Sequence, residues 1–213
     1  MGYFKNINLT YFRNFDYFNL EFSKNCNVLY GINGSGKTNI LESISLFSKG
    51  RGLRKDKLSN IIKKDFKKLI IKSDFQNQNV VYNLFAETLN KDNRIKKVLS
   101  INNDKSKDSL TTFYDLTSFL YFLPETERLF LSSPSIRRNF IDQLIFTYKR
   151  DYNKLINEYI KYLHERSKIL SSDHYDESWL DQLEKNISKN ALEIYFLREK
   201  QINVLIENLN DYL

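Results

Sequence analysis

Apolar and polar residues alternate near the start of the chain, in segments 3–9 and 16–22. A period of two residues is typical of strands with one buried face, and the Arg13-Asn14 pair between the segments predicts a turn. Residues 26–30 form a third apolar run, which we expect to be a strand, with Cys26 as a small core residue. After a glycine-rich stretch the apolar residues acquire a helical period. The predicted order is therefore strand, loop, helix.

Three β-rich runs follow in the middle of the chain, separated by clusters of Asn, Asp and Lys: 69–71, 80–85 and 98–101. Such runs are typical of an antiparallel meander. The sequence therefore predicts a subdomain of hairpins in this region.

After Pro124 the period becomes helical and stays helical to the end. Apolar stripes predict long helices over 152–170 and 180–209, and residues 171–174 between them are expected to form a turn and an N-cap. An antiparallel helical pair follows from this order. We therefore expect an α/β chain with two parts, a lobe at 1–130 and a helical domain at 131–213.

Composition excludes several classes of protein. The single cysteine rules out an intrachain disulfide, and two histidines without cysteine clusters or H-E-x-x-H spacing provide neither a zinc site nor a histidine-driven triad. The longest apolar run, 119–123, is much shorter than the roughly 20 residues that a membrane-spanning helix requires. We expect a cytoplasmic protein without a membrane segment.

Charge is concentrated in one part of the chain. The formal net charge is +7, and residues 49–72 contain ten basic side chains against Asp56 and Asp65. A surface of this kind binds nucleic-acid phosphates without sequence preference, although a solvated lysine face has the same composition. The candidate DNA contacts are Arg51, Arg54, Lys55, Lys57, Lys63 and Lys64, with Arg137 and Arg138 from the helical part.

The glycine-rich stretch has the spacing of a P-loop: Gly31, Ile32, Asn33, Gly34, Ser35, Gly36, Lys37 and Thr38. Glycines allow successive backbone N–H groups to turn inward around an anion, and the following helix adds its positive end. Lys37 is expected to reach the β- and γ-phosphates, and the Thr38 hydroxyl to bind Mg²⁺. A dinucleotide-binding loop is excluded because the third glycine of its pattern is missing. A simple tight turn would not explain why a Lys-Thr pair follows the glycines.

Further motifs stand in a fixed order around this loop, at 12–15 (FRNF), 50–54 (GRGLR), 122–125 (FLPE), 133–142 (SPSIRRNFID), 159–166 and 179–184, with Arg198. Together with the P-loop they resemble the N-terminal part of the RecF family of bacterial recombinational repair proteins. The resemblance implies an ATPase lobe similar to those of ABC transporters and SMC proteins, with an antiparallel β subdomain followed by a helical domain. It also makes Arg13 and Asn14 candidates for contacting the nucleotide, although a charged turn capping two strands remains the alternative.

The resemblance implies ATP and Mg²⁺ as cofactors and ATP-dependent dimerisation of the complete protein on single-stranded, gapped or double-stranded DNA. Recombinational repair, the SOS response and accessory partners of the RecR and RecO type are implied in the same way. The family's signature and acidic Walker B strand lie beyond the helical domain, so we expect no useful hydrolysis by this chain alone. The alternatives are a non-catalytic nucleotide- or DNA-binding module, another SMC-like head, or a nuclease of the overcoming-lysogenization-defect type.

Overall fold

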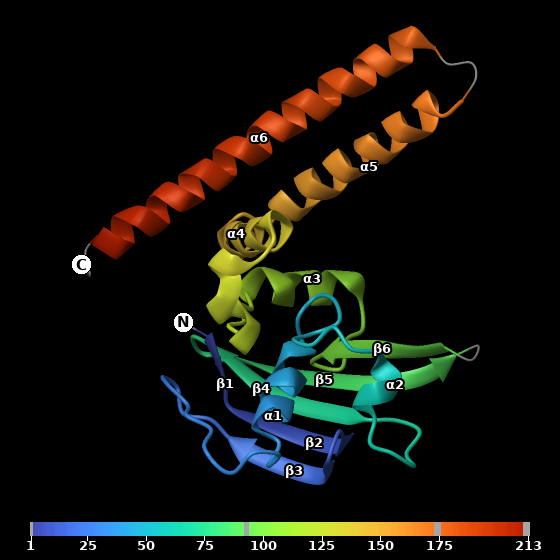
Figure 1. Ribbon diagram of the computed structural model, residues 1–213. Coiled ribbons are helices and arrows are strands. Elements are labelled where there is room, and N and C mark those ends of the chain that lie inside the picture. Colours follow the sequence, from blue (N-terminus) through green and yellow to red (C-terminus); the bar gives the residue numbers. More distant parts are fainter. Residues whose placement is uncertain (1, 92–93, 173–175, 211–213) are drawn as a thin grey trace. The chain divides into compact units, whose positions relative to one another are not determined.

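The computed structural model describes residues 2–91, 94–172 and 176–210 (Figure 1). The chain forms two compact units, Met1–Phe119 and Leu120–Leu213. The first unit is a sheet with helices, and the regular elements among the described residues of the second unit are all helices. Within the described residues no helix combines the length and the apolar character needed to cross a membrane.

The first unit contains a six-stranded antiparallel sheet. Its strands are β1 (Gly2–Phe4), β2 (Asn6–Phe12), β3 (Phe15–Glu21), β4 (Ile70–Asn77), β5 (Val80–Lys91) and β6 (Arg94–Ile101). They lie in the order β3-β2-β4-β5-β6, and β1 pairs separately with β4. The two N-terminal strands and the meander predicted from the sequence are thereby confirmed.

One face of the sheet forms the main core. Alternation places Ile7 and Leu9 of β2 inside, next to Ile71 of β4, and full burial of such side chains contributes about 1.5–3 kcal/mol each. Helices α1 (Lys37–Ser45) and α3 (Lys107–Leu116) pack on this face, and the short helix α2 (Leu58–Ile61) adds Ile61. The helix after the glycine-rich stretch was predicted, whereas α3 was not.

The alternation of β2 changes at its last residues. Tyr11 has a left-handed φ of 53°, an unusual conformation for an aromatic residue. Phe12, which strict alternation would place outside, is fully buried, while Tyr11 is only partly buried. The reversal therefore keeps the Tyr11 ring at the surface.

The second unit contains η1 (Pro124–Leu131), α4 (Pro134–Tyr148), α5 (Tyr152–Leu170) and α6 (Glu177–Asn210). Helices α5 and α6 run antiparallel, as predicted (Figure 1). The Asp176 carboxylate accepts hydrogen bonds from the N–H groups of Ser178 and Trp179 and so caps α6. Of the turn predicted at 171–174, residues 173 and 174 lie outside the described part of the chain.

A small core and one ion pair hold the helices of this unit together. Ile145, Tyr152 and Ile194 form the buried centre. Beside it, Asp142 of α4 binds Arg198 of α6 through Nε–Oδ1 and Nη2–Oδ2 contacts of 2.8 Å each, and accepts a 2.6 Å hydrogen bond from the Tyr152 hydroxyl. Asp142 and Arg198 both belong to the motifs that resemble the RecF family, and their ion pair links α4 to α6.

The prediction of a strand at 26–30 was wrong. These residues pair with no strand in the described part of the chain, and Cys26 is exposed rather than part of the core. Val28 is 78% exposed and Tyr30 is 92% exposed. A short apolar run is compatible with a strand, but ladder hydrogen bonds also need a neighbouring strand.

Candidate phosphate-binding site

Residues 31–36 form the loop between segment 26–30 and α1, and its shape depends on glycine. Gly36 is the N-cap of α1, with a left-handed φ of 97°. A Cβ atom at this position would lie 2.5 Å from Cζ of Phe15. Position 36 therefore requires glycine for two reasons: its backbone is left-handed, and the Phe15 ring at the β2–β3 turn lies too close for a side chain. Gly34 also has a positive φ, 83°, but open space surrounds it.

The N-terminal end of α1 points its backbone donors toward this loop. The N–H group of Ile40 donates to the Gly36 carbonyl over 3.0 Å, which starts the helical pattern. The preceding N–H groups have no intrahelical acceptor, as at every helix N-terminus. None of the described residues in the first turn of α1 is acidic. The end of the helix therefore offers a positive field to an anion.

Lys37 lies across the loop that precedes it. Its Nζ atom donates to the carbonyl oxygens of Gly31 and Ile32, each over 2.8 Å. Thr38 follows in the first turn of α1 and is exposed. The structure therefore brings the predicted lysine, the loop backbone and the start of the helix together.

Arg13 is bound by carboxylates of other segments. Its Nε and Nη2 atoms lie 2.9 and 2.6 Å from the two oxygens of Glu42, which is 1% exposed, and Nη2 also contacts Asp56 over 2.7 Å. The hydrogen bond with Glu42 is the main cause that raises the pKa of Arg13, and the bond with Arg13 is the main cause that lowers the pKa of Asp56. The predicted nucleotide contact Arg13 thus fastens the β2–β3 turn to α1.

Asn14 lies next to the start of α1. Its Oδ1 atom accepts a 2.8 Å hydrogen bond from Asn39, whose own Oδ1 accepts one of 3.1 Å from Arg54. Arg54 also contacts Glu42 over 3.3 Å. A polar network therefore connects the turn, helix α1 and the basic segment after it.

Lys97 is a feature of this region that sequence reasoning missed. It comes from β6, and its ammonium donates to the carbonyl oxygens of Leu46, Ser48 and Gly50 over 2.6, 3.2 and 2.9 Å. Burial lowers its pKa to about 8. The available signal was a lysine at an inward position of an otherwise apolar strand face. Lys97 satisfies carbonyl groups at and beyond the end of α1.

The predicted DNA contacts differ in their surroundings. Arg54 and Lys63 form ion pairs, with Glu42 and with Asp16. Within the described residues no ion pair involves the remaining candidates, all of them exposed: Arg51, Lys55, Lys57, Lys64, Arg137 and Arg138. Arg137 and Arg138 belong to α4 of the second unit, and the other candidates to the first.

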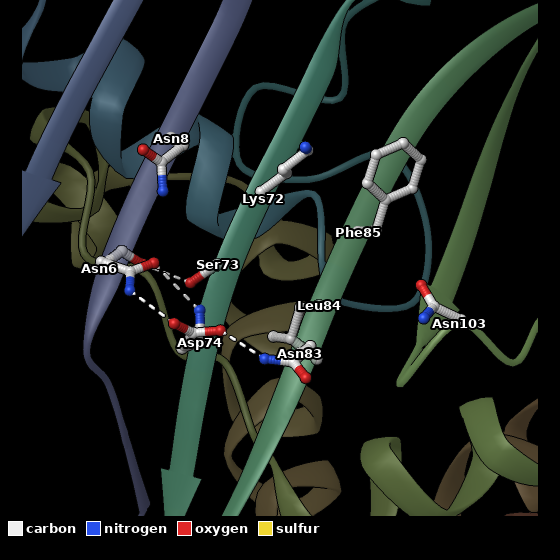
Figure 2. Close-up of a pocket in the computed structure, with 9 residues that line it drawn as sticks. All are labelled: Asn6, Asn8, Lys72, Ser73, Asp74, Asn83, Leu84, Phe85 and Asn103. Carbon is white, nitrogen blue, oxygen red and sulfur yellow. Dashed lines mark hydrogen bonds between the residues drawn. The ribbon is translucent and has the colours of Figure 1, made fainter.

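A hollow of about 440 Å³ lies elsewhere in the first unit, on the sheet (Figure 2). The Asp74 carboxylate in it accepts hydrogen bonds from the side-chain amides of Asn6 and Asn83, over 2.8 and 2.7 Å. These polar groups satisfy one another, and no P-loop residue lines the hollow. Across the described ranges there is also no cluster of three His, Cys, Asp or Glu residues suited to hold a metal ion.

A mixed sheet-and-helix unit with a glycine loop of P-loop spacing at the start of α1, followed by a helical unit, is the arrangement of the N-terminal lobe of a P-loop head. A family model, the RecF/RecN/SMC N terminal domain, matches residues 3–117, and the chain belongs to this family. The predicted fold class and the resemblance to RecF are confirmed.

The relatives are DNA replication and repair proteins named RecF. Those of Rickettsia conorii and Rickettsia typhi are 33% and 34% identical over 206 residues, which is 96% of this chain and 56% of each relative. Among solved structures, the recombination mediator protein RecF-ATPrS has a TM-score of 0.74 at 29% identity, and RecF-ATP one of 0.73 at 27%. Each match covers 95% of this chain and 54% of the other. The chain therefore spans about half the length of the relatives it matches.

Proposed function

We propose that the chain binds ATP on residues 31–38, as the N-terminal part of a RecF-type DNA replication and repair protein. The observation that carries the proposal is the position of Lys37, whose ammonium lies 2.8 Å from two carbonyls of a glycine loop at a helix N-terminus. The RecF structure with ATP, 27% identical, supports the choice of nucleotide.

The residues of the loop fit a triphosphate in their chemistry. The N–H groups of the loop and of the first turn of α1 would hold phosphate oxygens, and Lys37 would exchange its carbonyl partners for them. The Thr38 hydroxyl would contribute to Mg²⁺ binding. Asn14 keeps its proposed place beside the nucleotide, whereas we assign Arg13 to holding α1 through Glu42.

A fluorescent ATP analogue with Mg²⁺ tests this proposal. We expect Lys37→Ala to weaken binding at least about tenfold, because a charge-assisted contact is worth roughly 1.5–3 kcal/mol. Lys24→Ala, which removes an exposed lysine outside the loop, serves as the control and should bind like the wild type. Equal affinities for wild type and Lys37→Ala would show that the loop does not bind nucleotide.

We further propose that DNA binds to the exposed basic side chains of the segment 49–72, with Arg137 and Arg138 contributing. The supporting observations are the local excess of positive charge and the absence of ion pairs at Arg51, Lys55, Lys57 and Lys64 among the described residues. We propose that the complete protein forms an ATP-dependent dimer on DNA and binds accessory partners of the RecR and RecO type. The name of the solved relatives, which places RecF in the RecFOR pathway, supports this extension.

Charge reversal tests the DNA surface. Changing Lys55, Lys57, Lys63 and Lys64 together to Glu should abolish DNA binding at moderate salt and reduce its salt dependence. The matched control reverses four exposed lysines of the helical unit, which are Lys154, Lys168, Lys185 and Lys189. If the first variant binds DNA as the wild type does, the basic segment is not the DNA surface.

A further inference from the structure

Two aromatic rings stack at the surface of the first unit, where β2 ends. The rings of Tyr11 and Phe66 are nearly parallel, with an interplanar angle of 16° and centroids 3.7 Å apart. Phe66 lies in the loop after α2 and is 39% exposed. The exposed part of the Phe66 ring is apolar surface that faces solvent and does not contribute to the core.

The backbone around these rings is pinned in place. The N–H group of Lys63 donates to the Tyr11 carbonyl over 2.8 Å, and that of Arg13 donates to the Ile61 carbonyl over the same distance. A further hydrogen bond of 3.2 Å, from the Phe66 N–H to the Lys63 carbonyl, closes the turn that carries the ring. The stack therefore belongs to a fixed element and not to a free loop.

Two residues of this element have unfavourable backbone conformations. Tyr11 and Asp65 have φ values of 53° and 72°, in the left-handed region. Such conformations cost on the order of 1–3 kcal/mol each and are concentrated at functional sites. The strained conformation at Tyr11 keeps its ring outside the core and against Phe66, while the neighbouring Phe12 is buried.

Lysines flank the exposed ring on both sides of the sequence. Residues 63–68 contain four lysines and one aspartate. Lys63 binds Asp16, whereas Lys64, Lys67 and Lys68 are exposed and form no ion pair within the part of the chain that the structure describes. Aromatic rings next to ammonium groups are the combination that binds single-stranded nucleic acids, because bases stack on the rings and phosphates contact the lysines.

We propose that Phe66 stacks an unpaired base of a single-stranded nucleic acid and so extends the Tyr11–Phe66 pair, while Lys64, Lys67 and Lys68 contact the adjoining phosphates. A duplex hides the faces of its bases, and an acidic peptide would need the lysines but not the ring. The inference rests on the DNA binding proposed above. It adds that the nucleic acid is single-stranded and that Phe66 is the residue that distinguishes a single strand from a duplex.

Fluorescence anisotropy on the full chain tests the stacking with two labelled strands of equal length, an oligothymidylate and an abasic strand. We expect Phe66→Leu to weaken binding of the oligothymidylate about thirtyfold, the middle of the range for one stacked base, and to leave binding of the abasic strand unchanged. Changing Lys64, Lys67 and Lys68 to Gln should weaken both. Tyr17→Leu, which removes another exposed aromatic ring, is the control and should change neither.

A second variant reports on the ring without removing it. Phe66→Trp in a Trp179→Phe background leaves a single tryptophan in the chain, and its fluorescence should be quenched by oligothymidylate but not by the abasic strand. If Phe66→Leu binds oligothymidylate as tightly as the wild type, or loses both strands equally, the stacking is refuted while DNA binding stands. A wild-type chain that binds neither strand refutes both proposals. Affinity for the ATP analogue should be the same in Phe66→Leu and the wild type, and a loss there would refute the assignment to nucleic acid.

Discussion

The guanidinium of Arg13 forms a two-point contact with the carboxylate of Glu42, through Nε–Oε2 and Nη2–Oε1 distances of 2.9 and 2.6 Å. Glu42 is part of α1 and its side chain is 1% exposed, so Arg13 and Arg54 replace the water that would otherwise surround the carboxylate. The contact joins a turn near the start of the chain to the helix that begins at the glycine-rich loop.

Arg13→Ala is therefore expected to destabilise the first unit by about 3–5 kcal/mol, because removing one partner of a buried pair leaves the other charge uncompensated. Arg13→Lys should recover little, since an ammonium cannot make the two parallel contacts. Urea unfolding measures the free energy, and the exposed Arg51→Ala is the control. A loss below 1 kcal/mol for Arg13→Ala would show that Arg54 alone compensates Glu42.

The glycines of the loop should differ in their tolerance of a side chain. At Gly36 a Cβ meets both a left-handed backbone and the Phe15 ring, whereas at Gly34 it meets only the backbone strain. We expect Gly34→Ala to cost about 1–2 kcal/mol of stability, and Gly36→Ala a further 1–3 kcal/mol or so from overpacking. Thermal unfolding of both variants checks the order. Equal losses would mean that Phe15 moves away freely.

Lys97 should make the stability of the first unit depend on pH. Burial lowers its pKa to about 8 in the folded chain, against the ordinary lysine value of 10.5, so between these values the unfolded chain binds more protons. The free energy of unfolding contributed by this group therefore rises as the pH increases from about 8 toward 10.5, at roughly 1 kcal/mol per pH unit.

The comparison is with Lys97→Met, which keeps the length of the side chain and removes its titration. Urea unfolding at several pH values across this window should give a steeper rise for the wild type than for the variant. Parallel profiles would mean that the three carbonyl groups keep the ammonium charged and offset the effect of burial.

Two ion pairs of the helical unit should contribute very differently. Asp142 and Arg198 are mostly buried and form two parallel contacts supported by Tyr152, whereas Arg166 and Glu184 are 43% and 44% exposed. Arg198→Ala is expected to cost about 3 kcal/mol, and Arg166→Ala at most about 1 kcal/mol. Chemical unfolding followed by the helical circular dichroism signal measures both. Similar losses would indicate that the Asp142 network is already hydrated.

Local pattern was enough to predict most elements of this fold. Periods of two and of 3.6 residues located the β2–β3 hairpin, the meander and the long helices, and the spacing of Gly31, Gly36 and Lys37 located the loop. These signals depend on neighbours in the sequence. Segment 26–30 was misassigned because a short apolar run before a glycine-rich stretch is typical of a buried strand, although no partner strand is paired with it in the described structure.

The contacts that hold the site could not be predicted, because they join distant residues. Arg13 and Glu42 are separated by 29 positions, and Lys97 lies 51 positions from Leu46, whose carbonyl it binds. The resemblance to the RecF family suggested that Arg13 contacts the nucleotide, and only the fold showed two carboxylates beside it. The Tyr11–Phe66 stack also required the structure, since the strained backbone at Tyr11 reverses the expected alternation.

The sheet order gives the phosphate-binding loop a particular position in the folding of the chain. Strands β2 and β4 are neighbours, yet the hairpin β2–β3 and the meander β4–β6 are each built from local pairs. Residues 22–69, which contain the loop and α1, connect these two parts, so ordering them requires closure of a long segment whose entropic cost delays non-local pairing. A ligand that binds only the closed arrangement would add its binding free energy to the β2–β4 junction. Nucleotide concentration would then control how firmly the two halves of the sheet are joined.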